Sequence, residues 1–505
     1  MAEPGAPPML WLGVWCAVLF TTALMLDTRH NTFPYYYHPD EGSKVAQVMT
    51  GKWNYHHPML LLTATKAVAD LFRVAPREQS IVEAGRWISA AFTAGAIAVL
   101  SLLAFVWRGW VAAIGAGLAL LLHHQLFELA HYMKEDTALL FGTSLTFLTA
   151  FLYARRPDIW RALCLGAAAG CAISGKYIGV SVLAVALPVL WHAPRERRRA
   201  DALGFAAALA ASLLVINLPL VLHPGTFQQS FDREMQFVVH GQRGTTRSVP
   251  HTLYWNVFRD NSTPVIWALL LVFLAARWRE RRSLTLIEWL LIGYPFALAL
   301  ALSFSPKSND RYFLPATAML VLLAACGALD AARLFSRWVP MRWTAAGMAL
   351  TLAAAQFPGW ARYEAAFQHD DNAEFFQWLK TELPAASVVA KDSRIQLPNP
   401  DNSREANRFG HLPQKIVAAK FAADLGSMEE LRRQGITHAA VSESDYGRFF
   451  LRGLRPKEGE AEAFARRKAF YEQLLRDGEL VFERERGTVL YLHPGIRLYR
   501  LPPGD

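Results

Sequence analysis

The chain has 505 residues, of which 53% are hydrophobic and only 19% charged, so it is richer in apolar residues than a soluble protein of its size. The apolar residues lie in blocks of about 20, the length of a helix that crosses a bilayer. A net charge of +10 would suggest nucleic acid as a partner of a soluble chain, but here the arginines collect in short loops between apolar blocks. Composition therefore excludes a soluble protein and predicts a polytopic membrane protein.

The first apolar block, residues 9–26, lacks the basic region and the small-residue cleavage site of a removable signal peptide, so we expect a retained first span. Ten further blocks predict about eleven spans in all. The stretch 162–191 is either one long span or two short spans broken at residues 174–176, and we adopt two because one span would invert everything after it. The later blocks are 81–106, 111–126, 138–153, 162–173, 178–191, 202–222, 265–276, 284–303, 313–334 and 343–357.

Arginine marks every second connection between these blocks. By the positive-inside rule these connections are cytoplasmic, and the alternate ones lie on the outer side of the cytoplasmic (inner) membrane. The arginine-bearing connections contain Arg108; Arg155, Arg156 and Arg161; Arg195 and Arg197 to Arg199; Arg277, Arg279, Arg281 and Arg282; and Arg333, Arg337 and Arg342.

The sequence changes character after Pro358, so we expect a membrane domain over residues 1–358 and an extracytoplasmic α/β domain over 359–505. The second part has no long apolar block and alternates helical and strand-like patterns. The predicted helices are 372–383, 428–433 and 460–476, and the predicted strands are 387–390, 437–441, 479–485, 488–493 and 495–501.

The first outer loop, residues 27–80, contains adjacent carboxylates, Asp40 and Glu41, between Pro39 and Gly42. This setting is typical of a turn or a helix start near the membrane surface. Two interpretations fit: the acids cap a short interfacial helix and face water, or one of them acts as a base.

Further ionisable residues lie at the outer ends of later spans, where they are either interfacial anchors or functional. For Lys134 and Glu135 we favour the anchor, whereas Asp136 is equally a helix cap or a site residue. Lys176 is either a snorkelling lysine or a phosphate ligand. Arg311 enters an apolar span almost directly and needs a partner, for which a phosphate is suited.

The same residues resemble those of the membrane glycosyltransferases that use polyprenyl-phosphate sugars, a superfamily (GT-C fold, family 39-like) that includes the protein O-mannosyltransferases and the lipid A aminoarabinose transferase. One departure is His57, where relatives have the first proline of a Pro-Pro pair. The matching segments are Asp40-Glu41; His56 to Leu60; Lys134-Glu135-Asp136; Gly175-Lys176-Tyr177; Arg311 to Pro315; and the trailing α/β domain.

The resemblance implies that a sugar is transferred, with inversion, from a polyprenyl phosphate to a hydroxyl of a glycan, lipid or protein. It implies no nucleic-acid partner. It implies that Asp40 is the catalytic base, with Glu41 and Asp136 in support. Lys176, Arg311 and Lys307 would hold the donor phosphate, and His56, His57 and Tyr312 would contact substrate. No metal or other cofactor is expected.

The main alternative is a multi-span transporter of a lipid-linked or anionic substrate, since transporters also carry charges within many spans. Against it, no duplicated half is visible, and the ionisable residues collect at one surface rather than at the midplane.

Overall fold

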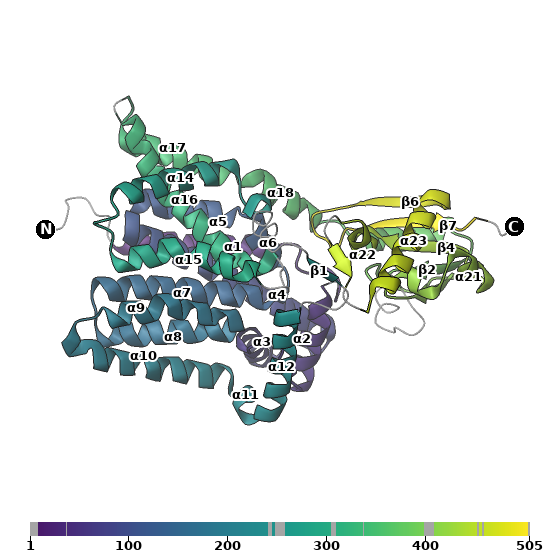
Figure 1. Ribbon diagram of the computed structural model, residues 1–505, viewed down its shortest axis with the longest axis horizontal. Helices are drawn as coiled ribbons and strands as arrows, with labels where there is room; N and C mark the ends of the chain where they lie inside the picture. Colours follow the sequence, from purple (N-terminus) through teal and green to yellow (C-terminus); the bar gives the residue numbers. More distant parts are fainter. Residues whose placement is uncertain are drawn as a thin grey trace. The chain divides into compact units, whose positions relative to one another are not determined.

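The computed structural model describes residues 9–36, 38–240, 245–247, 258–304, 310–336, 338–397, 409–451, 454–456 and 459–502 (Figure 1). The chain divides into two compact units. The first comprises Met1–His240 and Pro250–Ala361, and the second comprises Gly241–Val249 and Arg362–Asp505.

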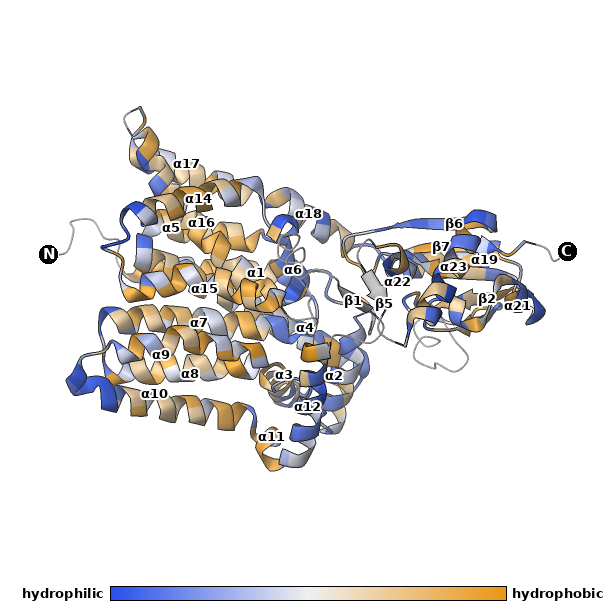
Figure 2. Cartoon of the chain, viewed as in Figure 1, coloured by the Kyte–Doolittle hydropathy of each residue, from blue (hydrophilic) through white to orange (hydrophobic). Residues whose placement is uncertain are grey.

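Every apolar block predicted from the sequence contains a helix of the first unit, and apolar residues predominate in most of these helices (Figure 2). The helices are α1 (Met9–Asp27), α4 (Glu78–Arg108), α5 (Trp110–Leu121), α6 (His124–Ala130), α7 (Glu135–Arg155), α8 (Ile159–Gly175), η1 (Tyr177–Val182), α9 (Leu183–Trp191), α10 (Arg195–Ile216), α11 (Leu218–Leu222), α14 (Pro264–Arg279), α15 (Leu286–Ser303), α16 (Leu314–Phe335), α17 (Met341–Ala354) and α18 (Phe357–Ala366), which runs across the boundary between the units.

By length and composition, six of the described helices can cross a membrane, or seven if the bent pair α5 and α6 forms one span. The helix α8 and the segment Tyr177–Trp191 are apolar but shorter. The break predicted at residues 174–176 is present between α8 and η1. The polytopic helical fold is therefore confirmed, and the number of about eleven spans stays a prediction.

Close helix contacts position the segments that carry the polar residues. In Figure 1, α8 lies between α7 and α10. Two glycines allow this approach: a Cβ at Gly142 of α7 would lie 2.3 Å from the backbone nitrogen of Ala172 in α8, and one at Gly166 of α8 would lie 2.2 Å from the carbonyl oxygen of Phe205 in α10. Any larger residue there would push the helices apart. On the other side of the unit α16 is almost enclosed, with 94% of its apolar window buried.

The first loop is mostly helical, with α2 (Pro39–Thr50) and α3 (Leu60–Leu71). Both are amphipathic: Val45 and Val48 of α2 and Leu61 of α3 pack with Ile81 at the start of α4. Two further elements complete this end of the unit, α12 (Pro224–His240) and the 3₁₀ turn η2 (Asp310–Phe313).

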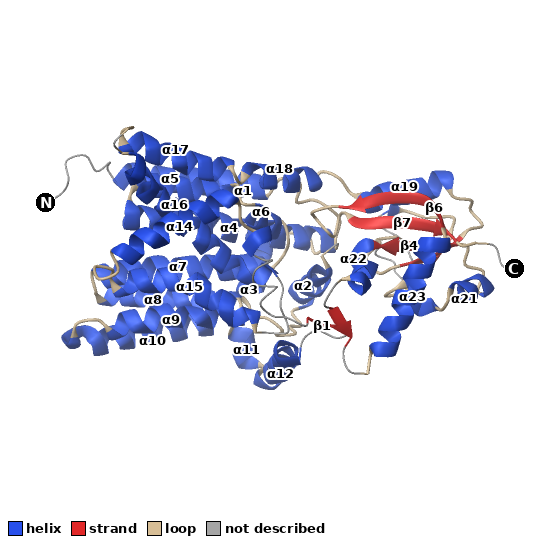
Figure 3. Cartoon of the chain, turned by 45° about the horizontal axis from the view of Figure 1, so that its top comes forward, coloured by secondary structure: helices blue, strands red, loops and turns tan. Residues whose placement is uncertain are grey.

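The second unit contains a five-stranded mixed sheet in the order β3-β2-β4-β7-β6 (Figure 3). Strands β3, β2 and β4 are parallel, and β7 is antiparallel to β4 and β6. One apolar cluster on it includes Phe375 and Leu379 and another includes Tyr471 and Leu474. The elements are β2 (Val388–Lys391), β3 (Lys415–Ala418), β4 (His438–Ser442), β6 (Glu479–Arg486), β7 (Pro494–Arg500), α19 (Asp371–Glu382), η3 (Ala422–Leu425), α21 (Met428–Arg433), α22 (Glu443–Tyr446), η4 (Gly447–Phe450), α23 (Ala461–Asp477), and the separate pair β1 (Thr245–Arg247) and β5 (Leu454–Pro456).

One predicted strand of this unit is wrong. Residues 488–493 form a turn in which the amides of Leu492 and His493 donate to the carbonyl of Val489. Val489 and Leu492 are buried, as the apolar pattern indicates, but the amide of Leu492 donates within the turn and its carbonyl accepts from the amide of Asp371 at the start of α19.

Candidate functional site

Two helix starts carry the predicted acids. Pro39 is the first residue of α2, and the amide of Asp40 donates to Nδ1 of His38 over 3.2 Å. Burial lowers the pKa of His38 well below its ordinary value, so its ring is neutral and Nδ1 can accept this bond. Glu135 and Asp136 lie in the first turn of α7. The positive N-terminal ends of α2 and α7 therefore favour the carboxylate forms of these side chains.

Asp40 lies between two cations. Its Oδ2 forms an ion pair with Nζ of Lys134 and lies 3.8 Å from a guanidinium nitrogen of Arg311. Burial acts to raise the pKa of Asp40, but the charges of Lys134 and Lys44 outweigh it and hold this pKa well below its usual range. The Asp40 side chain is 39% exposed whereas that of Lys134 is 1% exposed, so the carboxylate remains accessible to a second molecule.

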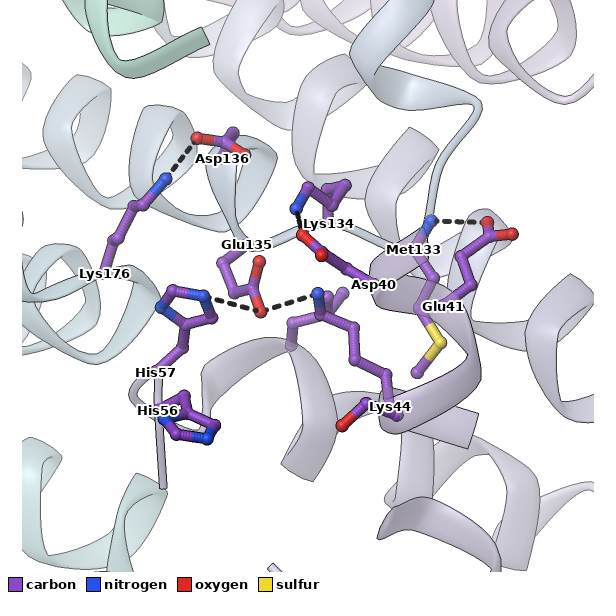
Figure 4. Close-up of polar contacts among 12 residues, drawn as sticks. Asp40, Glu41, Lys44, His56, His57, Met133, Lys134, Glu135, Asp136 and Lys176 are labelled. Atoms are coloured by element: carbon purple, nitrogen blue, oxygen red, sulfur yellow. Dashed lines mark hydrogen bonds and ion pairs between the residues drawn. The ribbon is translucent and has the colours of Figure 1, made fainter. Parts of the chain in front are cut away.

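Asp136 is not a helix cap, because the N-cap position of α7 is Lys134. Its Oδ1 accepts from Nζ of Lys176 over 2.6 Å (Figure 4). Nε of Arg311 lies 3.9 Å from its Oδ2. The lysine is brought here by Gly175, where a Cβ would lie 2.6 Å from the backbone nitrogen of Leu139 in α7. The structure thus places Lys176 and Arg311 around one buried carboxylate.

Aromatic and histidine side chains border the ion pairs. Nζ of Lys176 lies 4.2 Å from the centre of the Tyr312 ring, a cation–π contact. Nε2 of His57 lies 3.9 Å from Oε1 of Glu135, and burial lowers the pKa of His57 to about 4, so this ring is neutral at pH 7. His56 and His57 both line a polar pocket of about 200 Å³ next to Asp40. Lys307 lies outside the described residues.

Glu41 points to a different side of α2 from Asp40 (Figure 4). Its two oxygens accept from Nε and a terminal nitrogen of Arg86 over 2.9 and 2.8 Å, and both side chains are fully buried. Oε1 also accepts from the amide of Met133 over 3.2 Å. This pair ties α2 to α4 and to the segment that starts α7, so the geometry favours a positioning role for Glu41.

An apolar groove of about 530 Å³ begins beside the ionic centre. Pro58 lines the groove while the preceding His57 lines the polar pocket, and Tyr177 lines it while the preceding Lys176 pairs with Asp136. The groove is lined by Pro58, Ile173, Tyr177, Ala210, Leu213, Leu214, Asn217, Leu220, Val221, Pro224 and Phe227.

Asn217 fixes this junction. Its side chain donates to Oγ of Ser174 over 2.7 Å and accepts from the amide of Met59 over 3.0 Å. The hydroxyl of Tyr177 donates to the carbonyl of Tyr55 over 3.0 Å. Both contacts hold the loop before α3 against the end of α8, so the groove and the ionic centre keep their relative positions.

Three residues of this centre were not predicted as site residues. The sequence pattern favours anchors at Lys134 and Glu135, yet both are buried among opposite charges. Lys44 was missed, although its position four residues after Asp40 places both on one face of α2. Its Nζ lies 2.8 Å from Oε1 of Glu135.

Within the described residues, no group of three or more histidine, cysteine, aspartate or glutamate side chains is arranged to hold a metal ion. That the chain needs no metal or cofactor stays a prediction.

Comparison with known proteins supports the resemblance seen in the motifs. Residues 78–233 match the family model described as dolichyl-phosphate-mannose-protein mannosyltransferase. The chain resembles the polyprenyl-phosphate-dependent glycosyltransferases, as predicted. The matched stretch includes Asp136 and Lys176 but not Asp40 or Arg311. No curated protein matches the chain.

One solved structure shows the fold, and two others match the chain with lower TM-scores. The chain is 16% identical to ArnT from Cupriavidus metallidurans bound to undecaprenyl phosphate, with a TM-score of 0.53 over 97% of this chain and 98% of that one. Apo ArnT from the same organism gives 16% identity and a TM-score of 0.47 over 98% and 99%. The S. cerevisiae protein O-mannosyltransferase Pmt1–Pmt2 complex bound to the sugar donor gives 15% identity and a TM-score of 0.36 over 51% and 38%. The predicted fold class is confirmed by the first of these matches.

Proposed function

We propose that this protein is an inverting glycosyltransferase that moves a sugar from a polyprenyl-phosphate donor to an acceptor hydroxyl. The observation that carries the proposal is the junction of the apolar groove with the ionic centre. At two places the chain passes from the ionic centre or its polar pocket to the apolar groove between consecutive residues, namely from His57 to Pro58 and from Lys176 to Tyr177. A molecule that spans such a junction has a long apolar chain joined directly to a charged group, which describes a polyprenyl phosphate.

The charge of the centre matches this donor. Three carboxylates, those of Asp40, Glu135 and Asp136, face four cations in the described residues, namely Lys44, Lys134, Lys176 and Arg311. Three negative charges against four positive ones leave one net positive charge, and a phosphodiester carries one negative charge. Arg311 and Lys176 are the donors we assign to the phosphate, because both flank Asp136 and Lys176 directly precedes Tyr177 of the groove.

Asp40 is the base in this proposal. The acceptor oxygen forms a bond to the anomeric carbon while the bond from that carbon to the phosphate oxygen breaks, and the hydroxyl proton passes to Asp40. The leaving group departs as a polyprenyl phosphate monoester, whose added negative charge Lys176 and Arg311 stabilise. Attack opposite to the leaving oxygen inverts the anomeric centre. Glu41 holds Asp40 in place through Arg86.

We place the reaction at the outer face of the cytoplasmic membrane, with the second unit outside it. The support is the arginine pattern, since the loops between α7 and α8, α9 and α10, and α14 and α15 are arginine-rich, whereas the ionic centre lies at the opposite helix ends. The acceptor hydroxyl belongs to a glycan, a lipid or a protein.

The test is a comparison of glycans and glycolipids from cells that lack the gene and carry the wild type, Asp40→Asn or Asp70→Asn. Asp40→Asn keeps the shape of the side chain but cannot take the proton, so we expect product to fall at least about 100-fold. Asp70→Asn is the matched control, because Asp70 is an exposed acid on neighbouring α3 whose carboxylate pairs with Lys66 of its own helix. At equal protein levels in the membrane, a full glycan profile from Asp40→Asn removes Asp40 from the base role.

A further inference from the structure

Glu135, which lines the polar pocket beside Asp40, has one unsatisfied carboxylate oxygen among the described residues. Glu135 lines this pocket and its side chain is only 3% exposed. Its Oε1 pairs with Lys44, whereas its Oε2 has no hydrogen-bond partner among the residues that the structure describes. A buried acceptor without a donor costs about 1–3 kcal/mol, and more when it is charged. The Glu135 carboxylate therefore keeps an unused acceptor that a bound hydroxyl or amine would satisfy.

The other lining groups are suited to a hydroxylated ring. They include the hydroxyl of Ser43, the amides of Gln47 and Asn54 and the imidazoles of His56 and His57, with Leu62 and Pro39 as apolar neighbours. Hydroxyls both donate and accept, so a ring that carries several of them pairs with carboxylate, amide and imidazole together. At about 200 Å³ the pocket is smaller than the ~300–1,000 Å³ of sites for drug-sized ligands, so it takes one ring rather than an oligosaccharide.

The charge of the lining argues for a neutral ring. Two carboxylates, Asp40 and Glu135, line the pocket against one lysine, Lys44. The imidazole of His57 adds no charge at pH 7 because burial lowers its pKa to about 4. An acidic sugar would meet this negative excess, whereas the hydroxyl of a neutral sugar can donate to Oε2 of Glu135 and accept from Lys44.

We propose that this pocket holds the neutral sugar ring of the lipid-linked donor, and that Glu135 sets sugar specificity by accepting a hydrogen bond from a ring hydroxyl. The inference rests on the proposed function and deepens it. The donor, rather than the acceptor, is assigned because His57 of the pocket is followed directly by Pro58 of the apolar groove. One ligand can then place its lipid chain in the groove, its phosphate near Lys176 and its sugar in the pocket.

The experiment measures binding of defined lipids to the detergent-solubilised full chain. The probes are undecaprenol, undecaprenyl phosphate, and undecaprenyl phosphate carrying mannose, glucose, galactose or arabinose. We expect the wild type to bind at least one sugar-bearing lipid more tightly than undecaprenyl phosphate. Glu135→Gln should weaken that lipid about tenfold or more, the loss of one charge-assisted hydrogen bond, and should leave undecaprenyl phosphate within about twofold.

Controls separate this role from a structural one. Glu196→Gln changes an exposed glutamate of α10 in the same way and should alter neither affinity. If Glu135→Gln does not fold, Asn54→Ala in the same lining should lower the ratio of the two affinities instead. An equal loss for both lipids makes Glu135 structural and overturns the inference. The inference is also overturned if Glu135→Gln leaves the ratio of the two lipid affinities unchanged and weakens only the binding of the acceptor.

Failure of the proposed function gives a different result. In that case the wild type binds undecaprenyl phosphate and its sugar derivatives no more tightly than undecaprenol, which has no phosphate. A wild type that prefers the phosphate but ignores every sugar refutes only the sugar pocket.

Discussion

The buried pair of Glu41 and Arg86 gives the sharpest stability prediction. The Arg86 guanidinium donates to both Glu41 oxygens and to the carbonyls of Asn31 and Phe33 over 2.8 and 2.6 Å, and it lies 3.5 Å from the centre of the Phe33 ring. Because both charged side chains are 0% exposed, removal of one leaves the other charged and unpaired. Breaking such a pair costs about 3–5 kcal/mol. We therefore expect Arg86→Leu and Glu41→Leu each to lower the folded-to-unfolded ratio about 150- to 5,000-fold.

The assay is thermal unfolding of the detergent-purified variants. The double variant Glu41→Leu/Arg86→Leu should be no less stable than the worse single variant, because no unpaired charge remains. The double variant should still be less stable than the wild type, because the amide of Met133 and the carbonyls of Asn31 and Phe33 lose their hydrogen-bond partners. The matched control is Lys66→Leu, which breaks an exposed i,i+4 pair with Asp70 and should cost less than about 1 kcal/mol.

Two results would refute this reasoning. One is that both single variants unfold within about 1 kcal/mol of the wild type, which would mean that the pair contributes little to holding α2. The other is that the double variant loses the sum of the single losses, because independent effects add whereas a shared ion pair does not.

Three further predictions concern the site and the topology. Arg311→Lys should weaken the binding of undecaprenyl phosphate whichever sugar it carries, whereas Arg259→Lys, at an exposed arginine, should not. If the two variants bind these lipids equally well, Arg311 is an anchor. Burial and like charges lower the pKa of Lys134 to about 7, so kcat/KM should rise with pH through about 7 as this lysine loses its proton and releases the Asp40 carboxylate. Lys134→Arg stays charged and should lack this rise. The same pH profile in Lys134→Arg and the wild type would contradict the link. In a cysteine-free background, Thr50→Cys should react with an impermeant thiol reagent outside the cell and Ser283→Cys should not, and reaction of both from the same side would break the assigned topology.

Much of the fold follows from the sequence because bilayer thickness and hydrophobic periodicity act locally. A helix that crosses lipid must be apolar along its length, so every apolar block marked a helix. In the second unit, residues 488–493 were apolar and buried but formed a turn, and β3 was not predicted. Burial can be read from such short segments, whereas the partner of their backbone hydrogen bonds depends on the rest of the sheet.

The candidate site was only partly predictable for a related reason. The sequence identifies ionisable residues at helix ends, but it does not say which acid meets which cation. Lys176 reaches Asp136 because Gly175 lets α8 approach α7, and Glu135 faces Lys44 because α2 folds against the start of α7. The interpretation of Glu135 as an anchor considered only its own helix. Its role as a pocket residue depends on contacts between segments about 90 residues apart.

The ion pairs of the site also bear on the order of binding. Asp40 is a weak base while Lys134, Lys44 and Arg311 hold its pKa below the usual range. A phosphodiester that binds near Arg311 and Lys176 brings a negative charge, which attracts the same cations and raises the pKa of the Asp40 carboxyl. Donor binding thus strengthens the base that the acceptor needs. We therefore expect donor to bind before acceptor.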